Sequence, residues 1–210
     1  YKKYEAFGLD YSVLPAESTT RALQQQIDSA MMERDRQAML PQLENWRKKF
    51  DHKPRMVFLC ASGGGKRASL WTLNALQTAD SLSGGNLLRH SVLITGASGG
   101  LIGASYFREL KLREQQGEPI NPYANIHREK ISTDNLNPLI FSLLANDLFV
   151  GLTKFEYAGK AYTRDRAFTF EDQLNQITEG LMDKPIRDYA QEENMGNIPM
   201  VILTPTVIND

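Results

Sequence analysis

Two short apolar runs in this 210-residue chain each end in a glycine-rich turn that leads directly into a helical pattern. The first run covers residues 56–61 and its turn 62–66, and the second run covers 91–95 and its turn 96–100. Continuous apolar runs of this length are typical of strands buried on both faces of a parallel sheet. Parallel strands joined by a helix form a right-handed crossover unit. The sequence therefore predicts an α/β fold, a three-layer α/β/α arrangement with a mostly parallel central sheet.

The rest of the chain extends this pattern. Residues 67–82 carry apolar side chains at helical spacing between the two strands. Residues 101–116 follow the second turn as a helix with a charged C-terminal half, and an apolar run at 199–204 predicts a third buried strand. The other expected elements are a helix at 21–39 that Pro41 ends, a second polar helix at 42–50, a loop-rich stretch at 119–138, and short helices at 170–180 and 186–193.

Composition narrows the classes of function. The formal net charge of −1 does not suggest a nucleic acid partner. The single cysteine, Cys60, excludes an internal disulfide and a multi-cysteine zinc site, and its apolar surroundings predict a buried small residue. The sequence contains no apolar run long enough to span a bilayer and no signal peptide at its start. Because it begins at Tyr1 and stops at Asp210, we expect a fragment of a longer protein.

The second turn reads Gly96-Ala97-Ser98-Gly99-Gly100, a G-x-S-x-G pattern between a predicted strand and a predicted helix. Small flanking residues let the chain reverse sharply there, so that the serine side chain stands exposed at the carboxyl end of the strand. The helix that follows adds free amide groups and its positive dipole end. We therefore predict Ser98 as the nucleophile of an acyl-transfer reaction, supported by Gly96, Gly99 and Gly100.

The first turn supplies a candidate oxyanion hole. Gly63, Gly64 and Gly65 offer consecutive backbone N–H groups without side chains that would block a substrate. One well-placed donor of this kind lowers an acyl-transfer barrier by roughly 3–4 kcal/mol. Because both turns follow parallel strands, we expect them at the same edge of the sheet, where α/β proteins bind ligands. Arg67 is expected to brace the loop or attract a phosphate group, and Lys66 to be exposed to solvent.

Other interpretations of the turns were weighed on the same residues. The first turn also fits a relaxed dinucleotide fingerprint, which predicts an acidic residue at the end of the second strand, where Thr95 and Gly96 stand instead. A P-loop is excluded because Lys66 is followed by Arg67 rather than by Ser or Thr. The residues around Ser98 have a faint likeness to a chymotrypsin-like protease, but that fold is all-β. Both turns could also be simple tight connections.

A Ser-His-Asp triad in the α/β-hydrolase order is not expected, because it needs a histidine late in the chain. The histidines are His52, His90 and His127, and the last of them lies soon after Ser98. His52 and His90 flank the starts of the strands, at the sheet edge opposite the turns, and we expect them at the surface. His127 lies in a polar loop and is assigned no role.

Residues 61–68 and 95–100 together resemble the patatin-like phospholipases. That family has a glycine-rich loop written G-G-G-x-R-G and, downstream of it, a G-x-S-x-G nucleophile motif, and both are present here in this order and at this spacing. Ala68 replaces the last glycine of the loop, as in the cytosolic phospholipases of the same superfamily. The well-matched stretch is about 55–110. A looser similarity covers two later segments, Asp165-Arg166-Ala167 and the strand near 199–210.

The resemblance implies a serine–aspartate dyad without a catalytic histidine, in which Ser98 attacks an ester carbonyl and an aspartate takes its proton and then activates water. In the family, this aspartate lies in a D-G-G or D-G-A motif, which this sequence lacks. We therefore expect the aspartate beyond Asp210. Residues 1–53 would be an N-terminal helical arm, and 54–210 the N-terminal part of a catalytic domain whose C-terminal part is absent. The mechanism needs no metal and no cofactor.

The implied substrate is a lipid acyl ester, such as a phospholipid or lysophospholipid, hydrolysed through a covalent acyl-enzyme. The apolar segment 139–152 could line an acyl channel, touch a membrane surface, or form an ordinary core helix. We expect a cytoplasmic or membrane-associated location. The alternatives are an inactive patatin-like module that binds lipid or a partner through the same crevice, and a dinucleotide-binding oxidoreductase.

Overall fold

The computed structural model describes residues 28–134, 136–141, 144, 154–157, 159–164 and 166–203. Its elements, in chain order, are α2 (Ser29–Arg47), β1 (Val57–Ala61), α3 (Gly65–Leu82), α4 (Asn86–His90), β2 (Ser91–Gly96), α5 (Ser98–Gln115), α6 (Asn125–Ser132), α7 (Leu136–Phe141), β3 (Lys154–Tyr157), β4 (Lys160–Thr163), α8 (Arg166–Ile177), η2 (Ile186–Tyr189), α9 (Ala190–Asn194) and β5 (Met200–Leu203).

The three predicted strands form one sheet in the order β1-β2-β5, and both neighbouring pairs are parallel. Leu59 pairs with Ile94, which in turn pairs with Val201. The expectation of an α/β fold with a parallel sheet is thus confirmed. The helices predicted after the two turns also form, and each begins earlier than predicted, α3 at Gly65 and α5 at Ser98.

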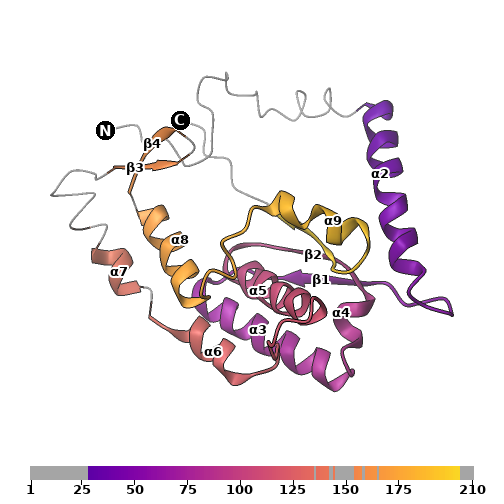
Figure 1. The fold of residues 1–210 in the computed structure, drawn as a ribbon, viewed down its shortest axis with the longest axis horizontal. Coiled ribbons are helices and arrows are strands. Elements are labelled where there is room, and N and C mark those ends of the chain that lie inside the picture. The colour runs from indigo at the N-terminus through magenta and orange to yellow at the C-terminus, as the bar shows by residue number, and fades with distance from the viewer. Residues whose placement is uncertain are drawn as a thin grey trace.

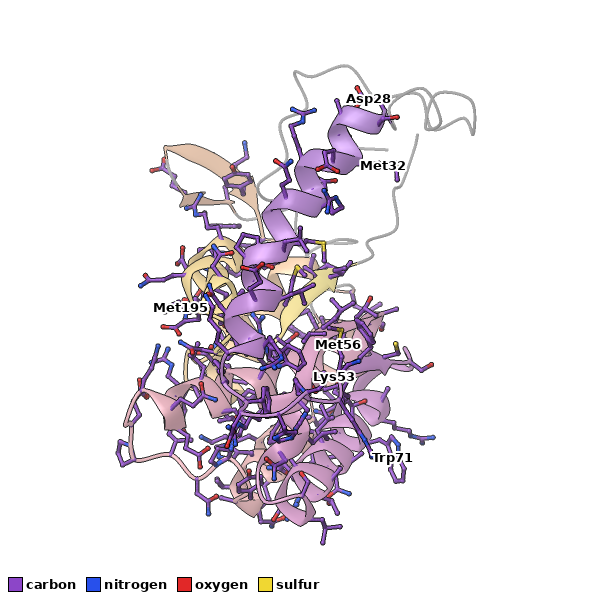
Figure 2. The ribbon with its side chains drawn as sticks, turned by 90° about the vertical axis from the view of Figure 1, so that its right-hand side faces the viewer. Asp28, Met32, Lys53, Met56, Trp71 and Met195 are labelled. Carbon is purple, nitrogen blue, oxygen red and sulfur yellow. The ribbon has the colours of Figure 1, made fainter. Side chains whose placement is uncertain are left out.

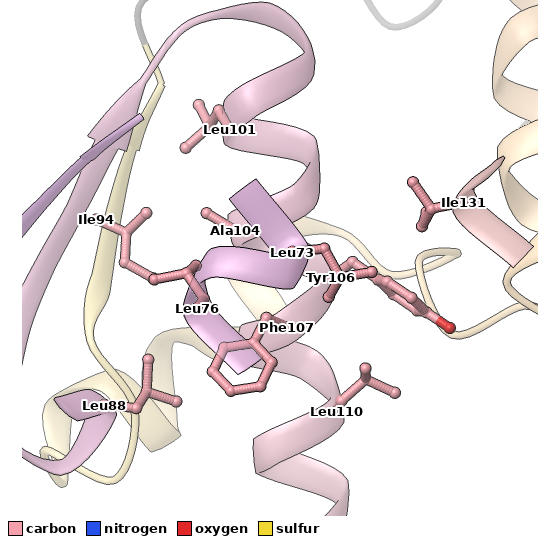
Figure 3. Close-up of a cluster of buried hydrophobic side chains, with 10 residues drawn as sticks. All are labelled: Leu73, Leu76, Leu88, Ile94, Leu101, Ala104, Tyr106, Phe107, Leu110 and Ile131. Carbon is pink, nitrogen blue, oxygen red and sulfur yellow. The ribbon is translucent and has the colours of Figure 1, made fainter. Parts of the chain in front are cut away.

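Helices α3 and α5 pack together against one face of the sheet and hold the core (Figure 1). Buried apolar side chains of both helices meet Ile94 of β2 and Ile131 of α6 (Figure 3). The core cluster consists of Leu73, Leu76, Leu88, Ile94, Leu101, Ala104, Tyr106, Phe107, Leu110 and Ile131. The core therefore fixes where both helices begin, and those beginnings lie at the carboxyl ends of β1 and β2.

The opposite face of the sheet is open around three apolar side chains. Phe58 and Ile202 are 57% and 43% exposed, and Cys60 is exposed as well. Strand β1 lies at the edge of the sheet, and its side chains alternate between half-buried and exposed. The expectations of a strand buried on both faces and of a buried Cys60 are therefore wrong, because no described residue covers this part of the face. The third layer of the fold stays a prediction.

Helix α2 is a single helix that continues through Pro41, so the predicted interruption there is wrong (Figure 2). It begins at Asp28, whose carboxylate accepts a hydrogen bond from the amide of Met31 at 2.5 Å. Tertiary contacts hold the turns after Pro41, because the Trp46 indole donates to the carbonyl of Arg89 at 3.0 Å. The first predicted helix, 21–39, lies partly outside the described residues.

The second half of the chain contains elements that the sequence did not reveal. Helix α6 falls in the stretch predicted as loop, and β3 and β4 form an antiparallel hairpin. Helices α8 and α9 with the 3-10 turn η2 confirm the two short helices expected there, with shifted bounds. Of the segment 139–152, the structure describes only 139–141, within α7, and residue 144. The proposed role of that segment lies largely outside the described residues.

Candidate functional site

Ser98 has an unusual backbone conformation at the junction of β2 and α5. Its φ is +51°, and Ser98 and Glu179 are the described non-glycine residues with positive φ. A left-handed conformation costs an L-residue roughly 1–2 kcal/mol, so the surrounding structure must hold it in place. The Ser98 side chain is exposed at the first residue of α5. The strand, the sharp turn and the helix that the G-x-S-x-G pattern predicted are therefore all present.

The first glycine turn lies directly against Ser98. A Cβ placed on Gly63 would be 3.4 Å from the Cβ of Ser98 and 3.5 Å from the carbonyl oxygen of Ala97. Parallel pairing of β1 with β2 sets Ala61 opposite Gly96, which brings the two turns to the same edge of the sheet. The amide of Ala97 also donates to the carbonyl oxygen of Ala61 at 3.2 Å. The predicted proximity of Ser98 to the first turn is thus present in the structure.

Close packing between the starts of α3 and α5 produces this proximity. A Cβ on Gly99 would overlap the carbonyl oxygen of Gly65, and a Cβ on Gly100 would overlap that of Ser62. The hydroxyl of Ser69 donates to the carbonyl oxygen of Gly99 at 2.7 Å. Glycines at these positions let the two backbones touch, so they position Ser98 by the side chains they lack.

The site has a positive electrostatic character that comes from the backbone. Helix α3 begins at Gly65 and α5 at Ser98, and neither helix has an acidic residue in its first turn. The first amides of a helix have no acceptor within the helix, and the dipole places partial positive charge there. Two such helix starts meet beside the Ser98 hydroxyl. This arrangement suits a negative charge that develops on a substrate oxygen.

Two mostly apolar cavities open on either side of Ser98. The α8 cavity has a volume of about 290 Å³ and lies between α5, α6 and α8. The β5 cavity has a volume of about 400 Å³ and lies between α5, η2 and β5. Ser98 and Ile102 line both of them. The α8 cavity is further lined by Lys66, Ile131, Leu139, Phe170, Leu174 and Ile177, and the β5 cavity by Leu101, Arg108, Met182, Lys184, Ile186 and Val201.

The two cations of the first turn face different surroundings. Lys66 is half-buried and lines the α8 cavity, where burial lowers the pKa of its ammonium group while nearby Asp134 acts in the opposite direction. Arg67 is exposed and lines a separate groove with Trp71, whose side chain projects from the surface (Figure 2). The expected exposure of Lys66 is therefore wrong. The sequence could not show this, because the facing of residues 66 and 67 depends on where α3 begins.

The histidines are not part of this site. His127 is buried in α6, not in a loop, and its ring bonds the hydroxyl of Tyr106 at 3.0 Å and the carbonyl oxygen of Asn121 at 3.0 Å. Burial lowers the pKa of His127, which favours the neutral ring. His90 is half-buried against Phe50, and His52 is exposed. Among the described residues that line the two cavities, none is His, Asp or Glu.

Three further findings bear on the class of site. The described part of the chain holds no cluster of three or more His, Cys, Asp or Glu side chains that could bind a metal ion. Within the same residues, no helix is both long enough and apolar enough to cross a bilayer. In comparisons with known proteins, no family model, no curated protein and no solved structure matches this chain.

Proposed function

We propose that this chain is a patatin-like lipid acyl-ester hydrolase with Ser98 as its nucleophile. The observation that carries the proposal is the left-handed backbone of Ser98, which holds an exposed hydroxyl against the first glycine turn. Strained residues of this kind persist only where the surrounding structure holds them, and they cluster at active sites. The paired G-G-G-x-R-A and G-x-S-x-G motifs support the assignment to this family.

In the proposed reaction, the Ser98 oxygen attacks the acyl carbon of an ester. The negative charge that develops on the carbonyl oxygen is stabilised by amides of the Gly63–Gly65 turn and of the α5 start. The bond to the alcohol then breaks, the alcohol leaves with the proton, and water hydrolyses the acyl-enzyme. The family resemblance implies an aspartate as the base, and it would come from outside the described lining of the site.

Two other functions weigh against this proposal to different degrees. A module that binds lipid or a partner without catalysis is favoured by one observation, the lack of acidic and histidine side chains among the described lining residues. A dinucleotide-binding oxidoreductase has less support, because β2 ends at Gly96 and offers no carboxylate for a ribose.

Active-site labelling separates these candidates. A fluorophosphonate probe reacts with an activated serine hydroxyl, so we expect it to modify Ser98 in the full-length protein and mass spectrometry to locate the adduct there. Ser98→Ala should abolish labelling. The matched control is Ser81→Ala, which changes an exposed serine near the far end of α3 and should label like the wild type. Labelling that survives Ser98→Ala would refute the proposed nucleophile, and a wild type that does not react would favour the binding module.

A further inference from the structure

The cavities on the two sides of Ser98 constrain the substrate more closely than a single acyl pocket would. Ser98 lies where they meet, and Ile102, one turn further along α5, lines both and separates them. Each is smaller than or near the lower end of the ~300–1,000 Å³ range of ordinary ligand sites. Two narrow apolar branches that diverge from one nucleophile fit a molecule with two apolar arms better than one with a single arm.

The position of the amides assigns the branches. A carbonyl oxygen directed at the first glycine turn places the acyl carbon beside Ser98, at the mouth of the α8 cavity, whose lining includes Gly65 and Gly99. The acyl chain can then enter this cavity between Ile131 and Leu174. The alcohol half of the ester lies on the other side of Ser98, toward the β5 cavity.

The β5 cavity also carries two cations that differ in their neutralisation. The Arg108 guanidinium pairs with Glu193 at 2.5 Å and donates to the carbonyl oxygen of Pro199 at 2.8 Å, so its charge is used within the fold. The Lys184 ammonium lies 4.2 Å from the centre of the Tyr189 ring, which contributes a cation–π contact but no negative charge. Lys184 thus places a positive charge in the wall of the cavity that would receive the alcohol half.

We infer that the substrate is a diacyl glycerophospholipid, with one chain in the α8 cavity and the other in the β5 cavity. This inference rests on the proposed function. Ser98 forms a bond to the carbonyl carbon of the first chain, the bond from that carbon to the glycerol oxygen breaks, and the glycerol oxygen leaves with a proton. The leaving group is the lysophospholipid, whose remaining chain contacts Ile186 and Val201. Lys184 pairs with its phosphate.

Three substrates with identical short acyl chains test this inference: a diacyl phosphatidylglycerol, the corresponding lysophosphatidylglycerol and the diacylglycerol that lacks the phosphate. The wild type should hydrolyse the diacyl phospholipid fastest. Ile186→Trp fills the β5 cavity from a side chain that is 53% exposed, so we expect kcat/KM for the diacyl phospholipid to fall about tenfold while that for the lysophospholipid stays nearly unchanged. Ile126→Trp, at a 48% exposed position on α6, is the matched control and should change neither.

The charge is tested separately. Lys184→Gln should lower kcat/KM several-fold for the phospholipid and leave hydrolysis of the diacylglycerol unchanged, whereas Lys53→Gln at an exposed site should alter neither. Equal losses for the diacyl and single-chain lipids in Ile186→Trp, or a wild type that labels with the fluorophosphonate probe but prefers the lysophospholipid, would overturn the two-chain inference. Failure of Ser98 to label would instead overturn the proposed function beneath it.

Discussion

The two glycine turns occupy equivalent places in the fold, yet they need glycine for different physical reasons. In the first turn, Gly65 has a φ of +61°, and a Cβ placed on it would meet no atom within 4 Å. In the second turn, Gly99 and Gly100 are buried, and a Cβ on either would overlap a backbone carbonyl oxygen of the first turn. Glycine is thus needed in the first turn for backbone conformation and in the second for close approach.

This difference shows which turn positions the other. The second turn is packed onto the first, and the contact between them brings Ser98 to Gly63. The first turn is exposed on its outer side, so it can present amides to a ligand while its inner side carries the packing. A substitution should therefore damage the site far more in the second turn than in the first.

The largest effect is expected for Gly99→Ala. The added methyl group would overlap the carbonyl oxygen of Gly65, so α3 and α5 must separate. We expect the free energy of unfolding to fall by about 3 kcal/mol and labelling of Ser98 to be lost, as measured by urea denaturation and by the fluorophosphonate probe.

Gly65→Ala is the matched comparison in the first turn. The methyl group meets open space, so the cost comes from the left-handed backbone alone and should be about 1 kcal/mol. If Gly65→Ala destabilises the protein as much as Gly99→Ala does, the proposed difference between the two turns is wrong.

A change at Ser98 should have an intermediate effect on stability and the opposite sign. Because Ser98 has a φ of +51°, Ser98→Gly removes the steric penalty and should raise the free energy of unfolding by about 1 kcal/mol. Ser98→Ala keeps the Cβ and should stay near the wild type, although both variants lose the nucleophile. Equal stabilities of the Gly and Ala variants in urea denaturation would show that the turn is not strained.

The smallest effect concerns Lys66 and pH. Burial lowers the pKa of Lys66 below 10.5 in the folded protein, so the unfolded chain binds more protons between the lowered value and 10.5. Stability therefore rises with pH across that window. Lys66→Met does not titrate there, so its stability advantage over the wild type at neutral pH should shrink as pH rises toward 10.5. Thermal unfolding over this pH range measures it, and an advantage that grows with pH would contradict the assignment.

The charged half of α5 shows how the same sequence signal led to different environments. The sequence correctly placed a helix with charged residues after the second turn, but its pattern did not reveal that Arg108, Glu109 and Lys111 are buried. Their partners come from elsewhere in the chain or one turn away, as with Glu193 for Arg108 and Arg113 for Glu109. Such pairings depend on which elements pack together, and local periodicity does not contain that information.

The site was predicted to a similar extent. The strand, turn and helix around Ser98 follow from local signals, because glycine spacing and short apolar runs act over a few residues. The α8 and β5 cavities do not, because Phe170, Leu174 and Ile186 lie far along the chain from Ser98 and reach it only through the fold. The facing of Lys66 and the exposure of Cys60 were missed for the same reason.

The sequence by itself determined that two parallel strands deliver two glycine turns to one edge of a sheet, and that a serine stands in the second. Only the tertiary structure decided that Ser98 lies between two cavities, that Lys66 faces one of them, and that part of the sheet's other face is open. The physical reason is range: backbone conformation and hydrophobic periodicity are set by neighbouring residues, whereas burial and cavity shape depend on every element that packs around a position.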